Sequence, residues 1–264
     1  MSFDVSADAY GRFMGRFSEP LAKQFLALAG VHRGQRALDV GCGPGALTAA
    51  LVDRLGPAAV SAVDPSPPFV AAMRERFASL DVRSAAAEAL PFPDGSFDVT
   101  LAQLVVHFMS DPVGGLTEMA RVTHPDGVVG ACVWDHGGGL GPLSAFWRAV
   151  LATDPLAHDE SQLAGAREGH LAELFGAAGL RDVEAGVLTV EVDYGSFDEW
   201  WEPYTFGVGP AGAYVAGLDE PRREALRARC AEQLPVAPFT IRAAAWTALG
   251  RPPIGELNDQ QVVR

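Results

Sequence analysis

The chain has 264 residues, 48% of them hydrophobic and 20% charged, which is typical of one large globular α/β domain with or without an insertion. Its formal net charge is −13, and no lysine- and arginine-rich cluster of the kind that follows a phosphate backbone is present. This charge excludes nucleic acid as the expected partner and disfavours large polyanionic substrates. We expect a small substrate that is neutral or cationic.

The cysteines and the hydropathy pattern bear on location. Cys42, Cys132 and Cys230 are an odd number without metal-ligand spacing, so we expect no metal site and a reducing compartment. The first residues lack the basic and apolar regions of a secretory signal, and no run of 18 apolar residues occurs. The sequence therefore predicts a cytoplasmic protein with no membrane partner.

Strands and helices are predicted to alternate through the first half of the chain. Short apolar runs predict strands at 37–40, 59–63, from 82, at 97–106 and at 128–134. Helices are predicted between them and before them, at 18–28, 46–55, 67–80 and 112–122. This order is typical of βαβ units, so we expect an α/β fold with a doubly wound, Rossmann-like sheet and helices on both faces.

The second half predicts helices at 143–151 and 169–178, then two long strands at 183–192 and 239–249 that pair antiparallel. An aromatic-rich stretch and a charged helix at 220–233 lie between these strands. The predicted organisation is a helical cap (1–33), a cofactor-binding core (34–136), the rest of the sheet with a substrate-covering helical insertion or lid at about 195–235 (137–250), and a tail (251–264).

Glycines follow the first strand, in the run Gly41-Cys42-Gly43-Pro44-Gly45. A strand that turns sharply into a helix while a ligand contacts its backbone needs residues without Cβ. The helix that follows directs its N–H groups at the ligand. Asp64, at the end of the second strand, is placed to accept both hydroxyls of a ribose.

Gly41-x-Gly43-x-x-Ala46 also satisfies the permissive dinucleotide fingerprint, which leaves a nicotinamide-dependent oxidoreductase as an alternative. Asp39 argues against it, because a carboxylate beside the loop repels a pyrophosphate but attracts an ammonium group. No Tyr-x-x-x-Lys pair for hydride transfer is present. A non-catalytic cofactor-binding platform is the other alternative.

Four motifs, in order over residues 34 to 134, carry a resemblance to a known family. Ala37–Thr48 (ALDVGCGPGALT) resembles motif I of class I S-adenosylmethionine-dependent methyltransferases, and Val63–Ser66 (VDPS) resembles their acidic second motif. Glu88–Asp98 and Glu118–Gly127 are similar to the third region and the pre-strand turn of the ubiquinone/menaquinone-biosynthesis-like (type 11) members.

The resemblance implies a seven-stranded, mostly parallel sheet with an antiparallel last strand. It also implies transfer of a methyl group from S-adenosylmethionine to an oxygen, nitrogen or carbon atom of a small molecule, with S-adenosylhomocysteine as product. A homodimer is a further expectation.

The resemblance assigns cofactor-binding roles to particular residues. The methionine part would lie against Gly41, Cys42 and Gly43, with its ammonium oriented by Asp39. Asp64, followed by Pro65, would bind the ribose. Ala87 and Glu88 would contact the adenine. Ala86 departs from the family pattern, since relatives often have Asp at that position. Gln103 would lie near the methionine part or the transferring methyl.

The segment from Tyr10 to Ser18 resembles an N-terminal element that closes over the cofactor in some relatives. Arg16 would then pair with the methionine carboxylate and Tyr10 would cover the sulfonium. The alternative is an amphipathic lead-in that packs on the sheet.

Two histidines follow strands at the edge where ligands bind, His107 after the fourth strand and His136 after the fifth. Either could act as a general base, which is needed only if the acceptor must lose a proton. His158 and His170 are expected at the surface.

Aromatic residues are expected to wall the substrate pocket, namely Trp134, Trp200, Trp201 and Tyr204. Their alternative role is the core of an inserted helical layer.

Overall fold

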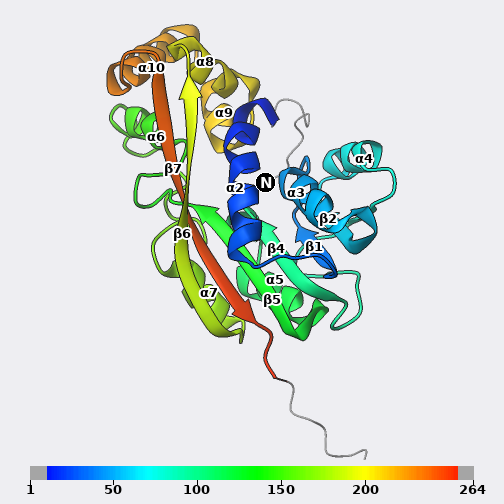
Figure 1. The fold of residues 1–264 in the computed structure, drawn as a ribbon. Helices are drawn as coiled ribbons and strands as arrows, with labels where there is room; N and C mark the ends of the chain where they lie inside the picture. The colour runs from blue at the N-terminus through cyan, green and yellow to red at the C-terminus, as the bar shows by residue number, and fades with distance from the viewer. Residues whose placement is uncertain (1–10, 255–264) are drawn as a thin grey trace, which may run out of the picture.

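A computed structural model describes residues 11–254 of the chain, and within this range seven strands form one sheet in the order β3-β2-β1-β4-β5-β7-β6 (Figure 1). Neighbouring strands pair in parallel except β7, which is antiparallel to both β5 and β6. The predicted seven-stranded, mostly parallel sheet is confirmed. The strands are β1 (Ala37–Val40), β2 (Val60–Asp64), β3 (Asp81–Ser84), β4 (Phe97–Gln103), β5 (Thr123–Trp134), β6 (Arg181–Tyr194) and β7 (Phe239–Arg251).

Helices cover both faces of the sheet, as predicted. One buried cluster joins the sheet to α2 (Arg16–Leu28), α3 (Ala46–Leu55) and α4 (Pro67–Arg76). The other joins it to α5 (Pro112–Val122) and α7 (His170–Ala177). Short connecting turns are η1 (Gly11–Gly15), a π-helix, and the 3₁₀ turns η2 (Pro57–Ala59) and η3 (Val106–Phe108).

The largest differences from the predicted strand bounds are in the fourth and fifth strands. The fourth strand ends at Gln103 instead of residue 106, because Leu104 takes a left-handed backbone conformation (φ 61°) and η3 follows. The fifth strand begins at Thr123 instead of 128, and residues 124–127 lie where the pairing register with β4 shifts between Phe97 and Val99. α4 ends at Arg76, four residues earlier than predicted, because the backbone leaves the helical conformation at Phe77.

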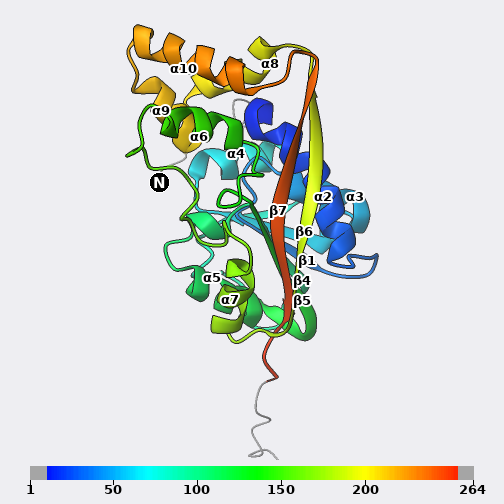
Figure 2. The same cartoon turned by 90° about the vertical axis from the view of Figure 1, so that its left-hand side faces the viewer.

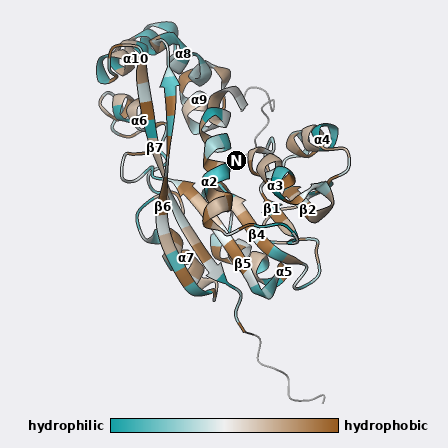
Figure 3. Cartoon of the chain, in the orientation of Figure 1, coloured by the Kyte–Doolittle hydropathy of each residue, from teal (hydrophilic) through white to brown (hydrophobic). Residues whose placement is uncertain are grey.

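The core is continuous under α2. A Cβ on Gly130 of β5 would meet the ring of Phe25 at 3.3 Å and the side chains of Leu101 and Leu249 at 2.8 Å. This glycine therefore lets α2 approach the centre of the sheet closely. Colouring by hydropathy shows apolar central strands and a mostly polar outer α10 (Figure 3).

A helical cap extends beyond the end of the sheet (Figure 2). β7 pairs with β5 over residues 245–250, whereas its earlier residues pair with β6 alone, so the two strands continue as a long arm. The arm carries the predicted insertion, which folds as α8 (Phe197–Trp201), η4 (Glu202–Phe206), α9 (Gly209–Ala216) and α10 (Glu220–Gln233). α10 also contacts α6 (Ser144–Leu151). None of the helices described in residues 11–254 has the length and apolar character needed to cross a membrane.

Candidate active site

A cavity of about 430 Å³ opens at the carboxyl ends of β1, β2 and β4. This is the edge of a doubly wound sheet at which ligands bind. Its walls combine the glycine loop, the segment after β2, the end of β4 and one residue of α2. They are Ser18, Asp39, Gly41, Cys42, Gly43, Pro44, Ala46, Leu47, Asp64, Pro65, Ser66, Pro67, Pro68, Phe69, Gln103, Leu104, Val105 and Phe108.

Two glycines of the loop have different surroundings. Gly41 has a φ of 71°, and a Cβ there would meet both Cγ atoms of Val105 at 2.5 Å. Gly43 has a φ of 51°, and no atom lies within 4 Å of where its Cβ would be. Gly41 is therefore required by packing, whereas the space at Gly43 is open on the cavity side of the loop.

Asp64 connects the two loops that border the cavity. Its carboxylate accepts a hydrogen bond from the Gly43 backbone N–H (2.9 Å) and another from the Ser66 N–H (2.8 Å). Burial raises the pKa of this carboxyl, and the two backbone hydrogen bonds oppose the rise. A carboxylate has about four lone-pair sites, so Asp64 can still accept from a pair of hydroxyls.

Asp39 is a buried carboxyl in the cavity wall, with 1% of its surface exposed. Its partner is Thr48, whose hydroxyl donates to Oδ2 at 2.5 Å. Burial raises the pKa of Asp39 to about 7, and the charge of Asp64 contributes to the rise. A cation bound beside Asp39 would favour its ionised form.

Two polar atoms in the wall lack hydrogen-bond partners. Gln103 donates from Nε2 to the Ser18 carbonyl at 2.9 Å, which joins β4 to α2, but its Oε1 is buried and unpaired. The Ser18 hydroxyl is also buried and unpaired. Leaving such groups unsatisfied costs about 1–3 kcal/mol each. Both therefore fit a polar ligand in this cavity.

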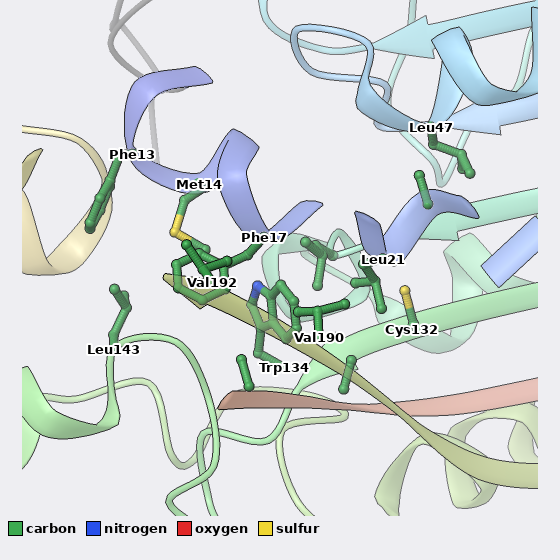
Figure 4. Close-up of a cluster of buried hydrophobic side chains, with 14 of the residues drawn as sticks. Phe13, Met14, Phe17, Leu21, Leu47, Cys132, Trp134, Leu143, Val190 and Val192 are labelled. Atoms are coloured by element: carbon green, nitrogen blue, oxygen red, sulfur yellow. The ribbon is translucent and has the colours of Figure 1, made fainter. Parts of the chain in front are cut away.

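A second, smaller cavity of about 40 Å³ adjoins the first, and Leu104 and Phe108 line both. Trp134 lies in its wall, and Figure 4 shows this residue beside Phe17 and Val190. The full lining is Phe13, Met14, Leu104, His107, Phe108, Trp134, His136, Leu143, Glu160, Val208, Gly209, Pro210 and Ala211.

His107 and His136 both line this smaller cavity and are neighbours, with ring centroids 5.9 Å apart. Burial lowers the pKa of His107 well below 6.5, and the neighbouring His136 lowers it further. Burial also lowers the pKa of His136, although Glu160, Asp135 and Asp159 act in the opposite direction. His107 is therefore a neutral imidazole at pH 7.

The structure brings most of the residues predicted from the sequence to these two cavities. Residues predicted to bind the cofactor line the larger cavity at seven positions, Asp39, Gly41, Cys42, Gly43, Asp64, Pro65 and Gln103. The smaller cavity contains His107, His136 and Trp134. Tyr10 lies outside the described residues.

Three predicted cofactor residues line neither cavity. Arg16 donates to Glu199 at 2.7 Å and to the Asp193 carbonyl at 2.6 Å, so its guanidinium is held by the β6 arm and α8. Ala87 is buried in the core, and the Glu88 carboxylate accepts from the backbone N–H groups of residues 110 and 111 before α5. Their cofactor roles stay predictions.

Trp200, Trp201 and Tyr204 lie in the core of the cap and line neither cavity. Tyr204 is the centre of the cluster, with Phe146 stacked on it at 4.6 Å and Trp200 at 4.8 Å. Phe13 contacts its edge at 5.0 Å. This packing corresponds to the helical-layer alternative, and a role of these residues at the substrate stays a prediction.

Several wall residues were not singled out from the sequence. Leu104 and Phe108 directly follow β4, and Ser66–Phe69 directly follow β2, so their position after parallel strands was the available signal. Glu160 lies between α6 and α7, in a stretch without hydrophobic periodicity, and no sequence motif around it indicates a site residue. Among the described residues, no group of three or more His, Cys, Asp or Glu could hold a metal ion.

The sheet order, the glycine turn and the two acids at neighbouring strand ends define a Rossmann-like fold with a cavity at its ligand-binding edge. Residues 38–130 match the family described as "Methyltransferase domain". This match agrees with the resemblance to type 11 methyltransferases that the four motifs predict.

Two curated relatives and one solved structure illustrate the similarity. Malonyl-[acyl-carrier protein] O-methyltransferase from Serratia marcescens is 32% identical over 129 residues, which cover 47% of this chain and 50% of that protein. Aklanonic acid methyltransferase DauC from Streptomyces sp. (strain C5) is 28% identical over 154 residues, covering 56% and 65%. The chain thus spans between half and two thirds of the length of these relatives.

The solved structure is phosphoethanolamine N-methyltransferase 2 from Haemonchus contortus, in complex with phosphomonomethylethanolamine and S-adenosylhomocysteine. It aligns with a TM-score of 0.59 at 18% identity and covers 94% of this chain and 57% of that one. At this identity the likeness concerns the fold.

Proposed function

We propose that the chain transfers a methyl group from S-adenosylmethionine to a small-molecule acceptor. The observation that carries the proposal is the pair of adjoining cavities. The larger cavity contains two carboxylates, Asp39 for a cation and Asp64 for a ribose. The smaller cavity, which adjoins it, contains the neutral imidazole of His107. The relatives that share the domain are named as methyltransferases, which supports the same reaction.

The residues of the larger cavity fit S-adenosylmethionine. The buried Asp39 would hold the ammonium group, and Asp64 would accept hydrogen bonds from the ribose hydroxyls. The unpaired Gln103 Oε1 and Ser18 hydroxyl would meet polar atoms of the methionine part. S-adenosylmethionine supplies a methyl carbon activated by its sulfonium. The complex of the structural relative with S-adenosylhomocysteine supports this choice of cofactor.

The chain's own contribution is mainly alignment and exclusion of water. The apolar residues that line both cavities, the buried Leu104 and the half-buried Phe108, would hold a nucleophile against the donor side and keep the reacting atoms dry. Orientation of two reactants can supply about 7–11 kcal/mol of rate acceleration. A base is required only for an acceptor that must lose a proton.

The nicotinamide-dependent oxidoreductase is not favoured. Asp39 is buried beside the loop that would receive a pyrophosphate, and a second carboxylate, Asp64, borders the same cavity. The non-catalytic platform is likewise not favoured, because residues 38–130 match a methyltransferase domain and the relatives are named as methyltransferases.

Isothermal titration of the full chain with S-adenosylhomocysteine and, separately, with NAD⁺ tests the cofactor. We expect S-adenosylhomocysteine to bind and NAD⁺ not to bind, and the reverse result would overturn the proposal. Transfer of a labelled methyl group to a panel of phenols, amines and activated methylenes tests turnover. Tight cofactor binding with no transfer to any of them would favour the platform.

The surroundings of the reaction are also proposals. We propose a small neutral or cationic substrate, a cytoplasmic location, no nucleic acid or membrane partner, and assembly as a homodimer. The three cysteines are free and buried, which supports a reducing compartment.

A further inference from the structure

Two residues that line the smaller cavity each carry a buried nitrogen without a hydrogen-bond partner. These atoms are His107 Nδ1 and Trp134 Nε1. An indole N–H can only donate, whereas one nitrogen of a neutral imidazole accepts. Because unsatisfied buried groups are costly, the pair fits a ligand group that accepts one hydrogen bond and donates another.

The charge of the residues that line the smaller cavity restricts the chemical class of the group that can bind there. Glu160 is 5% exposed, and its Oε2 accepts from the Trp147 indole at 3.0 Å. Among the lining residues that the structure describes, Glu160 is the formally charged one, and no arginine or lysine accompanies it. A carboxylate or phosphate would be repelled here and would offer no proton to His107. An ammonium group would leave the Trp134 N–H without an acceptor.

From this match we propose that the smaller cavity binds the reacting hydroxyl of the acceptor, a phenol or an enol, and that His107 and Trp134 are its hydrogen-bond partners. The inference rests on the proposed function and specifies its substrate class. A hydroxyl is the common reacting group that both donates and accepts at one atom. At about 40 Å³ the cavity holds about one water-sized group, so it receives the reacting end of the acceptor.

The proposed methyl transfer needs no further reactant, because the proton and both electron pairs are accounted for. The hydroxyl proton passes to His107 Nδ1, and the oxygen electron pair forms the new bond to the methyl carbon. The electron pair of the broken carbon–sulfur bond stays on sulfur. Trp134 donates to the oxygen while its negative charge develops.

The proton taken by His107 has charged neighbours. His136 lies 5.9 Å away between ring centroids, and the carboxylates of Glu160, Asp135 and Asp159 act on His136. These carboxylates favour positive charge on His136, which can receive the proton from His107. The products are a methyl ether, S-adenosylhomocysteine and a proton that leaves by way of the histidines.

Indole N–H resonances provide a test that does not depend on turnover. The full chain, saturated with S-adenosylhomocysteine, is titrated with phenol, benzoate or benzylamine, which share one ring and differ in the polar group. The Trp134 signal is assigned with Trp134→Phe. Trp200, which lines neither cavity, serves as the internal reference.

We expect phenol to shift the Trp134 signal in a saturable way, while benzoate and benzylamine leave it in place and the Trp200 signal stays still. Trp134→Phe should weaken phenol binding about fivefold, the effect of one lost hydrogen bond of about 1 kcal/mol, with unchanged S-adenosylhomocysteine affinity. A Trp134 signal that phenol does not move, or that benzoate or benzylamine moves equally, overturns the hydroxyl proposal. Failure of S-adenosylhomocysteine itself to bind would instead overturn the proposed function.

Discussion

The two cavities are built in different ways. The larger is walled mostly by residues within the family-matched part of the chain, at the ends of three neighbouring parallel strands. The smaller gathers residues from the N-terminal turn, β5, the loop before α7 and the start of α9. The larger is thus specified by backbone topology and local sequence. The smaller exists only once distant segments have packed together.

Two glycines of the loop that borders the larger cavity also differ in their surroundings, since Gly41 packs against Val105 and Gly43 does not. Substitution of Gly41 should have the largest effect of those predicted here. Gly41→Ala should lower the free energy of unfolding by about 3 kcal/mol, because the new methyl group meets Val105 and the φ is positive. Gly43→Ala should cost about 1 kcal/mol, since its surroundings are open, but should weaken S-adenosylhomocysteine binding. Urea unfolding and isothermal titration of both variants separate the effects. Equal destabilisation would contradict the distinction.

His107 tests the chemistry of the smaller cavity. His107→Asn should lower kcat toward a phenol at least 100-fold, the usual contribution of a general base, and leave S-adenosylhomocysteine affinity unchanged. His158→Asn, at an exposed position, is the matched control. Because the pKa of His107 is lowered, wild-type kcat should stay constant from pH 8 to 6.5 and fall only at lower pH. A decline already above pH 6.5, or a variant with normal kcat, would remove His107 from the reaction.

Asp64 tests the larger cavity. Asp64→Ala should weaken S-adenosylmethionine binding by about 2 kcal/mol through lost charge-assisted hydrogen bonds. Asp98 is a matched control, because it also accepts from a backbone N–H, that of Arg36 at 2.7 Å, and does not line the cavity. Titration calorimetry of Asp64→Ala and Asp98→Ala gives the comparison. Unchanged affinity in Asp64→Ala would mean that the ribose is held elsewhere.

The smallest expected effect is a pH dependence at Asp39, whose pKa of about 7 is raised above its ordinary 3.8. The ionised form holds the ammonium, so S-adenosylhomocysteine affinity should fall about tenfold between pH 8 and pH 6. Between pH 3.8 and 7 the folded state binds the extra proton, and stability of the unliganded protein should fall as pH rises through this window.

Asp39→Asn should remove both trends and unfold at a higher temperature than the wild type at pH 8, as thermal denaturation would show. Affinity that is constant with pH in the wild type would indicate that Asp39 does not contact the ammonium.

The sequence was sufficient where local signals decide the structure. The bounds of α3, α5 and α10 agree with their predictions residue for residue. Gly56 ends the first of these helices, whereas Asp111 and Asp219 cap the other two with Pro at the opening turn. The acids at strand ends were found for the same reason, since topology alone brings Asp39 and Asp64 to one edge.

Tertiary contacts explain what the sequence did not show. The left-handed Leu104 ends β4, although its N–H still bonds to the Cys132 carbonyl at 2.8 Å on the next strand. The ion pair of Arg16 with Glu199 joins residues 183 positions apart. Glu160 reaches the smaller cavity through its bond to Trp147. No periodicity or motif in one chain encodes such pairings.

Of the residues that wall the smaller cavity in the described structure, three fall inside the matched family region, Leu104, His107 and Phe108. The rest come from outside it, including the short stretch 208–211 at the start of α9. In the proposed function, the residues that select the acceptor therefore lie mostly outside the part of the chain that binds the donor. If the proposed function holds, grafting that stretch from a relative should change which acceptor is methylated while S-adenosylhomocysteine affinity stays the same.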